Sequence, residues 1–338
     1  MLSVVAMGAS EYGEILVLTR ALKSYLLKPG DYSRLLEGGL EDFLAVLRET
    51  VYGKLVEDLT ADERSVMKLE TRLKSDYYQV LRRILDRVPK KALSFYTVLE
   101  SATVVDLLKP LLIASSIGYT SPTLADYSSE ISKILPKALN GDLKGLISMI
   151  RDEGLRIDIE KSIRSKLYGL MDVFAFRRLW TETDSLEEND KKAVRRLLGV
   201  KLDLLTMRAV LRAKRMKMDY EAAREAITLV GYKIRPETFE EALKAETVEE
   251  AIEVFRNAGC YPDAVDVASR DLDELDLLIR KKVVEACRGV FSGYPFNAAI
   301  PLAYLELKQN EMANLITIAN GKLEELSRAV IEKNLILY

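Results

Sequence analysis

Helical amphipathic periodicity runs through almost the entire chain and is the strongest constraint on its fold. In the segment 62–88, apolar residues return every three or four positions, at Val66, Leu69, Leu73 and Tyr77. This spacing places them on one face of an α-helix, whereas a half-buried strand would alternate apolar and polar residues. Alternation of that kind between turn signals is scarce in this sequence. The pattern therefore predicts an all-α protein.

Helix starts are indicated by a recurring local spacing. A serine or threonine followed three residues later by glutamate forms a capping box, in which the two side chains satisfy backbone amides at a helix start. The hydroxyl residues with this spacing are Thr60, Ser185, Thr238 and Thr247. We expect a helix to begin at each of them.

Several stretches of the chain follow the same order of residue types and indicate an internal repeat. Residues 25–48 and 232–256 share a basic residue, a proline and an aromatic residue at the same offsets, with one residue inserted in the later stretch. A fainter copy includes Ala138, and the stretches 203–214 and 311–322 also align with each other. The near-equal steps predict three similar helical units of about 105 residues. We place these units at 1–115, 116–220 and 221–338.

Composition narrows the classes of function open to such a chain. Histidine is absent, which removes the commonest general base and the commonest zinc ligand. The two cysteines, Cys260 and Cys287, form no CxxC motif, so we expect neither a thiolate zinc site nor a disulfide framework. The phosphate-binding patterns GxGxxG and GxxxxGK(S/T) are missing, so we expect no direct nucleotide binding. The sequence thus predicts no catalytic residue, no cofactor and no metal.

The charges of the chain nearly cancel, with 50 Lys and Arg residues against 52 Asp and Glu residues. Such a balance gives no overall field that would attract nucleic acid, so we expect no nucleic-acid partner. The most apolar stretch, 107–119, contains Lys109 and Pro110 and is shorter than the roughly 20 apolar residues of a membrane span. We expect a chain that does not cross a bilayer but is free to lie beside one.

Basic residues on one predicted helix are the candidates for a partner-binding site. Arg208, Arg212 and Arg215 follow the i, i+4, i+7 spacing of one helical face. Together with Lys214 and Lys217 they form a basic run that would meet acidic loops of a partner and guide assembly. The alternative interpretation is a solvated helix face.

Clustered acidic residues leave an enzyme open as another alternative. Glu187, Glu188 and Asp190 stand just before Lys191 and Lys192, an order that favours a solvated helix start over a catalytic site. Acid–base catalysis by carboxylates would require a cleft that holds acids of raised pKa.

Short motifs in a fixed order connect these observations with a known family. They are Tyr12-Gly13 with Arg20, then residues 49–53, 205–214, 294–296, 302–305, 311–315 and 321–322. In this order and spacing, the chain resembles the C subunit of archaeal-type (A/V-type) ATP synthases, a relative of the d subunit of eukaryotic V-ATPases.

The resemblance implies three pseudo-symmetric helical domains in a funnel-like arrangement and a non-catalytic role. It implies a peripheral membrane subunit of the central stalk, on the cytoplasmic side of the cell membrane. The implied partners are the axle subunits of the stalk and the membrane proteolipid ring, so that ion-driven rotation is coupled to ATP synthesis or hydrolysis. The alternative that the repeat leaves open is a helical-repeat scaffold protein of another assembly.

Overall fold

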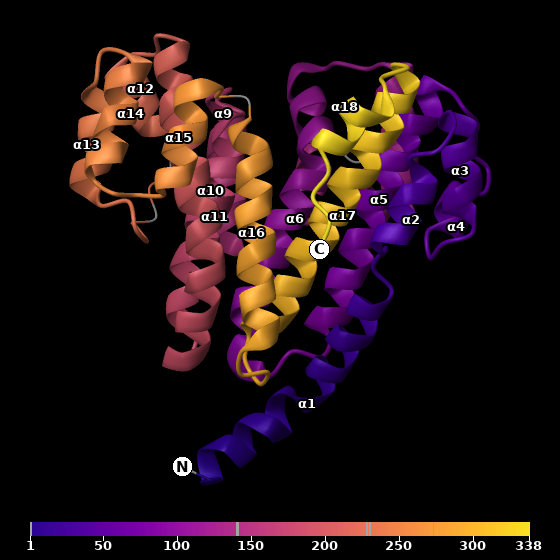
Figure 1. Ribbon diagram of the computed structural model, residues 1–338, viewed down its shortest axis with the longest axis horizontal. Coiled ribbons are helices and arrows are strands. Elements are labelled where there is room, and N and C mark those ends of the chain that lie inside the picture. The colour runs from indigo at the N-terminus through magenta and orange to yellow at the C-terminus, as the bar shows by residue number, and fades with distance from the viewer. Residues whose placement is uncertain (1, 140–141, 228, 230, 273) are drawn as a thin grey trace. The chain divides into compact units, whose positions relative to one another are not determined.

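The computed structural model describes residues 2–139, 142–227, 229, 231–272 and 274–338, with side chains from residue 11 onward. Within these ranges the chain forms α-helices and short 3-10 helices and contains no strand. The predicted all-α fold is therefore confirmed (Figure 1).

Apart from a few additional helices named at the end of this paragraph, one order of helices recurs three times along the chain. It consists of three helices of at most 12 residues, a longer helix and then a helix of at least 25 residues. The first pass is α2 (Pro29–Leu35), α3 (Leu40–Arg48), α4 (Gly53–Val56), α5 (Glu63–Leu85) and α6 (Lys90–Ile117). The second is η1 (Pro136–Ala138), α8 (Leu143–Ile147), α9 (Glu153–Arg164), α10 (Leu170–Glu182) and α11 (Glu188–Arg215). The third is α13 (Pro236–Lys244), α14 (Val248–Asn257), α15 (Pro262–Arg270), α16 (Leu275–Ser292) and α17 (Ala299–Leu323). The remaining helices are α1 (Leu2–Ser24), α7 (Pro122–Ser132), η2 (Thr183–Ser185), α12 (Tyr220–Ala226) and α18 (Arg328–Lys333).

The chain separates into two compact units, each assembled from distant stretches. Unit 1 comprises Met1–Pro89, Thr103–Arg151 and Tyr304–Tyr338, and unit 2 comprises Lys90–Ala102 and Asp152–Ala303. The helices α6 and α17 contribute residues to both units. Each compact unit therefore combines helices from more than one of the three series. The division into three repeats is a different kind of division and stays a prediction.

Unit 2 is built around α11 and α16, which lie side by side (Figure 1). The face that α11 buries carries Met207, Val210 and Leu211, all fully inaccessible to solvent. Cys287 of α16 is equally buried, so the pair excludes water along its contact. The helices α13 and α14 pack onto α11, and α15 packs onto α14 and α16.

Unit 1 contains the first short helices together with α5, α7 and the part of α17 from Tyr304 onward. Its core is rich in large aromatic side chains, including Tyr12, Tyr32, Phe43 and Tyr52, which are at most 2% exposed. Burying such rings contributes strongly to the hydrophobic stabilisation of this unit, together with the aliphatic side chains of the same core.

One of the four predicted helix starts is confirmed. Thr247 is the N-cap of α14 and accepts a hydrogen bond from the Glu250 amide at 3.1 Å. The other three predictions are wrong, because the N-caps of α5, α11 and α13 are Asp62, Glu187 and Arg235. At α5, the Asp62 carboxylate accepts from the backbone amide of Ser65 at 2.8 Å and takes the capping role predicted for Thr60.

Two further expectations concern the cysteines and the possibility of a membrane-spanning helix. Cys260 and Cys287 are both buried and form no disulfide. Across the described ranges, every helix is too short or too polar to span a bilayer.

Candidate partner-binding site

The predicted basic run lies on the last two turns of α11 and just beyond its end, in unit 2. Arg208 and Arg212 both form ion pairs with Asp276, which lies in the first turn of α16. The Arg212 Nη2–Asp276 Oδ2 distance is 3.0 Å. These two arginines therefore share one carboxylate within the unit and help to hold α11 beside α16.

Lys214 also makes an internal contact. Its ammonium donates a hydrogen bond to the carbonyl oxygen of Leu243, near the C-terminal end of α13. The last carbonyls of a helix have no intrahelical partner, so a cation there satisfies one of them.

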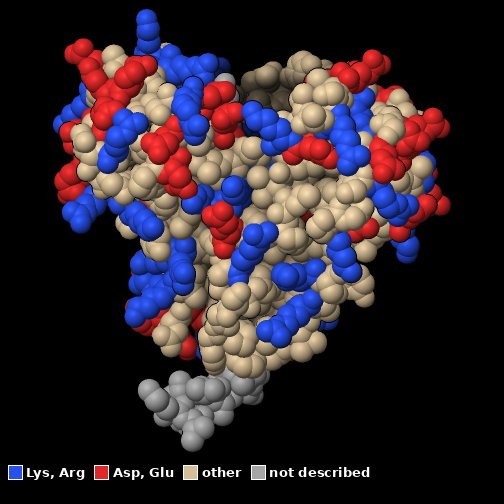
Figure 2. All heavy atoms as spheres, viewed as in Figure 1, with Lys and Arg blue, Asp and Glu red and all other residues tan. Residues whose placement is uncertain are grey.

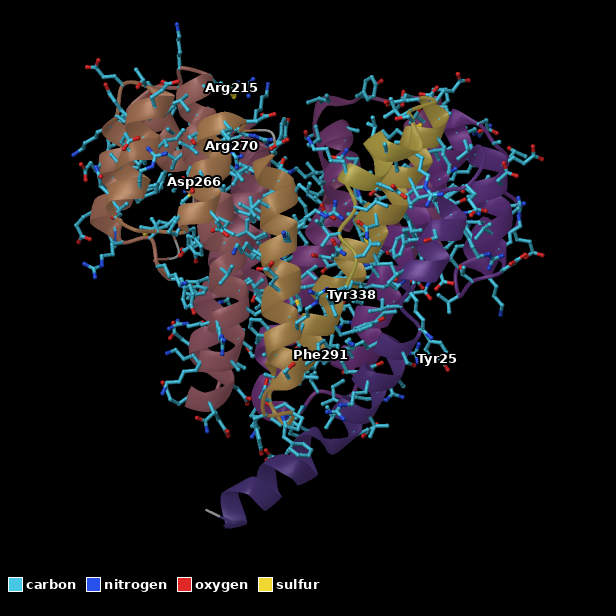
Figure 3. All side chains as sticks on the ribbon, in the orientation of Figure 1. Tyr25, Arg215, Asp266, Arg270, Phe291 and Tyr338 are labelled. Atoms are coloured by element: carbon cyan, nitrogen blue, oxygen red, sulfur yellow. The ribbon has the colours of Figure 1, made fainter. Side chains whose placement is uncertain are left out.

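Arg215 and Lys217 are the exposed members of the basic run. Arg215 lines a hollow of about 410 Å³ together with residues of α14 and α15, among them Arg256 and Arg270. Figure 3 shows Arg215 near Arg270, where α11 and α15 both end, and Asp266 lies one turn earlier in α15. Acidic side chains line the same hollow, and Figure 2 shows both signs of charge intermixed over the surface of α12–α15.

The acidic cluster at the start of α11 differs from its prediction at one residue. Asp190 is only 4% exposed, and its carboxylate accepts a hydrogen bond from the backbone amide of Ala298 at 2.9 Å. The expected solvated helix start is wrong for Asp190, because the carboxylate holds the segment that leads into α17. Glu187 and Glu188 are exposed, as predicted.

Two fully buried carboxylates, Asp203 and Glu311, form polar contacts that the sequence predictions missed. Asp203 of α11 accepts hydrogen bonds from the backbone amides of Lys233 at 2.6 Å, Ile234 at 3.1 Å and Tyr232 at 3.3 Å. The Tyr261 hydroxyl donates a further bond to Asp203 at 3.1 Å. Burial raises the pKa of Asp203, and these four hydrogen bonds oppose the rise.

Glu311 of α17 has a similar environment in unit 1. Its Oε2 accepts a hydrogen bond from the Leu27 amide at 2.5 Å, and its Oε1 accepts one from the Tyr52 hydroxyl. The Lys308 ammonium lies 3.9 Å from Glu311 and 2.9 Å from Asp76. Burial raises the pKa of Glu311, whereas Lys308 and the Tyr52 hydroxyl lower it.

These carboxylates are placed for holding backbone rather than for catalysis. Asp203 and Glu311 are both 0% exposed, and neither lines the hollow beside Arg215 or a second hollow of about 670 Å³ between α5 and α7. An acid that does line the second hollow, Asp126, is bound by Arg64 at 2.7 Å, which lowers its pKa. In the described ranges, no three His, Cys, Asp or Glu residues are grouped to hold a metal ion.

A signal for the buried pair was present in the sequence. The aligned stretches 203–214 and 311–322 both begin with an acidic residue and end with a lysine. Asp203 and Glu311 occupy the same position of the two stretches, each directly before two apolar residues. An acidic residue that recurs in such a position indicates a buried side chain that accepts hydrogen bonds. In contrast, Asp276 lies far from Arg208 in sequence, so local spacing carries no sign of their pairing.

Comparison with known proteins gives a match that covers nearly the whole chain. The ATP synthase (C/AC39) subunit family matches residues 15–334. The C subunit of the A-type ATP synthase of Methanococcoides burtonii is 19% identical, over 98% of this chain and 95% of that protein. The protein of the same name from Pyrococcus abyssi is 23% identical, over 89% of this chain and 83% of its own length. This chain belongs to the ATP synthase (C/AC39) subunit family.

Proposed function

We propose that this chain is a central-stalk (rotor) subunit of an A/V-type ATP synthase. In this role it is a non-catalytic socket that links the central axle to the membrane proteolipid ring. Ion-driven rotation of the ring is thereby coupled to ATP synthesis or hydrolysis in other subunits. The family match over residues 15–334 is the observation that carries the proposal.

The physical character of both units supports a mechanical task. Long helices such as α6, α11 and α17, of 28, 28 and 25 residues, give each unit rigid struts. Close-packed interiors deform little, and buried carboxylates bonded to backbone amides fix the short helices in one register. A subunit that transmits torque needs this stiffness and needs no reactive group.

The proposed partners are the axle subunits of the stalk and the proteolipid ring, and the proposed location is the cytoplasmic side of the cell membrane. Each contact would bury on the order of 800 Å² per partner to be specific and stable. We assign Arg215 and Lys217 to one of these contacts, because their side chains are exposed at the end of α11. Arg208, Arg212 and Lys214 would then act indirectly, by holding that end in place.

The three-repeat division at 1–115, 116–220 and 221–338 belongs to the same proposal. The recurring order of helices supports it, because each pass ends in a helix of 25 residues or more. Three similar units in a funnel-like arrangement would present a socket to the axle. A scaffold protein of another assembly, the alternative, would stack its repeats as an open solenoid.

Co-purification from membranes solubilised in mild detergent tests the proposed function. An affinity tag on this chain should recover the catalytic head, the axle and the proteolipid ring together. Recovery of the tagged chain alone, or with a set of proteins that lacks the ring and the axle, would contradict the proposal.

A charge-reversal pair tests the assignment of Lys217. Lys217→Glu should lower recovery of the complex, whereas Lys166→Glu should leave it unchanged. Lys166 is a matched control because it is also exposed, follows a helix in unit 2 and has a left-handed backbone, with φ of 59° against 53° for Lys217. Equal recovery with both variants would remove Lys217 from the contact without affecting the assignment of the chain to the stalk.

A further inference from the structure

The aligned stretches of α11 and α17 make equivalent contacts with different short helices. On α11 the acid Asp203 and the base Lys214 stand three helical turns apart, and on α17 Glu311 and Lys322 have the same separation. At 1.5 Å of rise per residue, each pair spans about 16 Å of helix. This length suits a short helix that lies alongside.

The α11 pair contacts the two ends of α13 within unit 2. Asp203 accepts hydrogen bonds from the amides of residues 232–234, which lead into α13 at Pro236. Lys214 donates to the carbonyl oxygen of Leu243, one residue before α13 ends. One acid and one base therefore bind the backbone before and at the end of the same short helix.

The α17 pair contacts the two ends of α2 within unit 1. Glu311 accepts from the amide of Leu27, which lies two residues before α2 begins. Lys322 donates to the carbonyl oxygens of Glu37 at 2.8 Å and Gly38 at 2.5 Å, just after α2 ends. Leu27 and Ile234 occupy the same position in the alignment of 25–48 with 232–256.

A tyrosine completes each contact. The hydroxyl of Tyr52 donates to Glu311, and that of Tyr261 donates to Asp203. Each tyrosine follows the second short helix, α3 or α14, by a few residues. Each acid therefore binds the segment before the first short helix and the tyrosine that follows the second.

We propose that the Asp203–Lys214 and Glu311–Lys322 pairs are two copies of one docking surface, through which a long helix holds the short helix pair of another repeat. On α11 the occupant is α13–α14, directly downstream. On α17 the occupant is α2–α3, so the same surface ties the last long helix to the N-terminal part of the chain.

The two copies open independently of each other if the proposal is right. A buried amide that loses its acceptor bears the full cost of desolvation, so each acid should protect the backbone that it contacts. Opening of one copy leaves the hydrogen bonds of the other intact, because the two copies share no residue. Local opening of this kind is read by amide hydrogen exchange.

Hydrogen exchange of the full chain, measured on peptides that cover 24–39 and 231–246, tests the proposal. Glu311→Gln should speed exchange in 24–39 by about tenfold or more and leave 231–246 unchanged. Asp203→Asn should have the converse effect, so each variant is the matched control for the other. Equal acceleration in both peptides, or no acceleration in either, would overturn the proposal.

The lysines provide the second arm of the test and keep it decisive if an acid variant does not fold. Lys322→Met should speed exchange at residues 36–39, and Lys214→Met should speed it at residues 243–246. Each lysine variant is expected to leave the other copy protected. Acceleration that spreads evenly over the chain would show general destabilisation and refute a local docking role.

Discussion

The Lys308 ammonium donates a hydrogen bond to the Tyr52 hydroxyl at 2.7 Å and lies 4.3 Å from the centre of the same ring. Lys308 is only 5% exposed, and it also binds Asp76 at 2.9 Å. A buried cation is tolerated when carboxylates and a ring face surround it. The positive charge of Lys308 thus offsets the negative charges of Glu311 and Asp76 in the interior of unit 1.

Lys308→Met should lower the free energy of unfolding by about 3 kcal/mol, because it leaves the buried Glu311 carboxylate without its cation. Chemical denaturation measures this change. Lys192→Met is the control, since Lys192 is exposed and pairs with Glu188 on the surface, where a loss below about 1 kcal/mol is expected. Similar losses in both variants would contradict the importance of the buried cation.

Gly199→Ala should destabilise unit 2 by about 1–3 kcal/mol through overpacking. A Cβ atom at residue 199 would lie 2.4 Å from Cγ of Tyr232, whose ring also packs against Trp180 at a centroid distance of 6.4 Å. Gly289→Ala in α16 is the matched control, because a Cβ there meets nothing within 4 Å. That variant should gain up to about 1 kcal/mol, as alanine favours the helix. The melting temperatures of the two variants should therefore shift in opposite directions. Shifts in the same direction would contradict the close contact between residue 199 and the Tyr232 ring.

The Asp58 carboxylate should contribute to an acid-sensitive part of the stability. Hydrogen bonds from Arg72 lower the pKa of Asp58 to about 2 from an ordinary value of 3.8. A depressed acid stabilises the fold at pH above the unfolded value, and this contribution is lost as the pH falls from 3.8 toward 2. Because Asp58 is largely exposed, the expected contribution is below about 1 kcal/mol.

Asp58→Asn should therefore flatten the dependence of unfolding free energy on pH between about 4 and 2. Denaturant titrations at several pH values in this window measure the slope. An unchanged slope in Asp58→Asn would show that the Arg72–Asp58 pair does not contribute.

Asp276→Ala should cost no more than about 1 kcal/mol, although it removes the shared partner of Arg208 and Arg212. These side chains are partly exposed, so the loss should shrink further as salt screens the charges. Thermal unfolding in low and high salt checks both expectations. A large loss that does not depend on salt would mean that the carboxylate has a packing role.

The fold class could be predicted from periodicity, because helical spacing of apolar residues is a local property. Helix starts were less predictable, since Asp62 and Thr60 compete for one capping position and only the folded geometry decides between them. Thr247 has no such competitor at α14, and there the local pattern was sufficient.

The candidate site could be predicted only in part, for a related reason. Helical spacing correctly grouped Arg208 and Arg212 on one face, but their partner Asp276 comes from another helix and has no local signature. The roles of Asp203 and Glu311 also depend on distant backbone amides. Their shared position in two aligned stretches was the one sequence signal for those roles.

An electron cryo-microscopy image of the ATP synthase, purified through a tag on this chain, tests the central claim most directly. We predict density for this chain between the axle and the proteolipid ring, in contact with both. Density on a peripheral stalk, or a complete rotor from which this chain is absent, would contradict the proposed role in the central stalk.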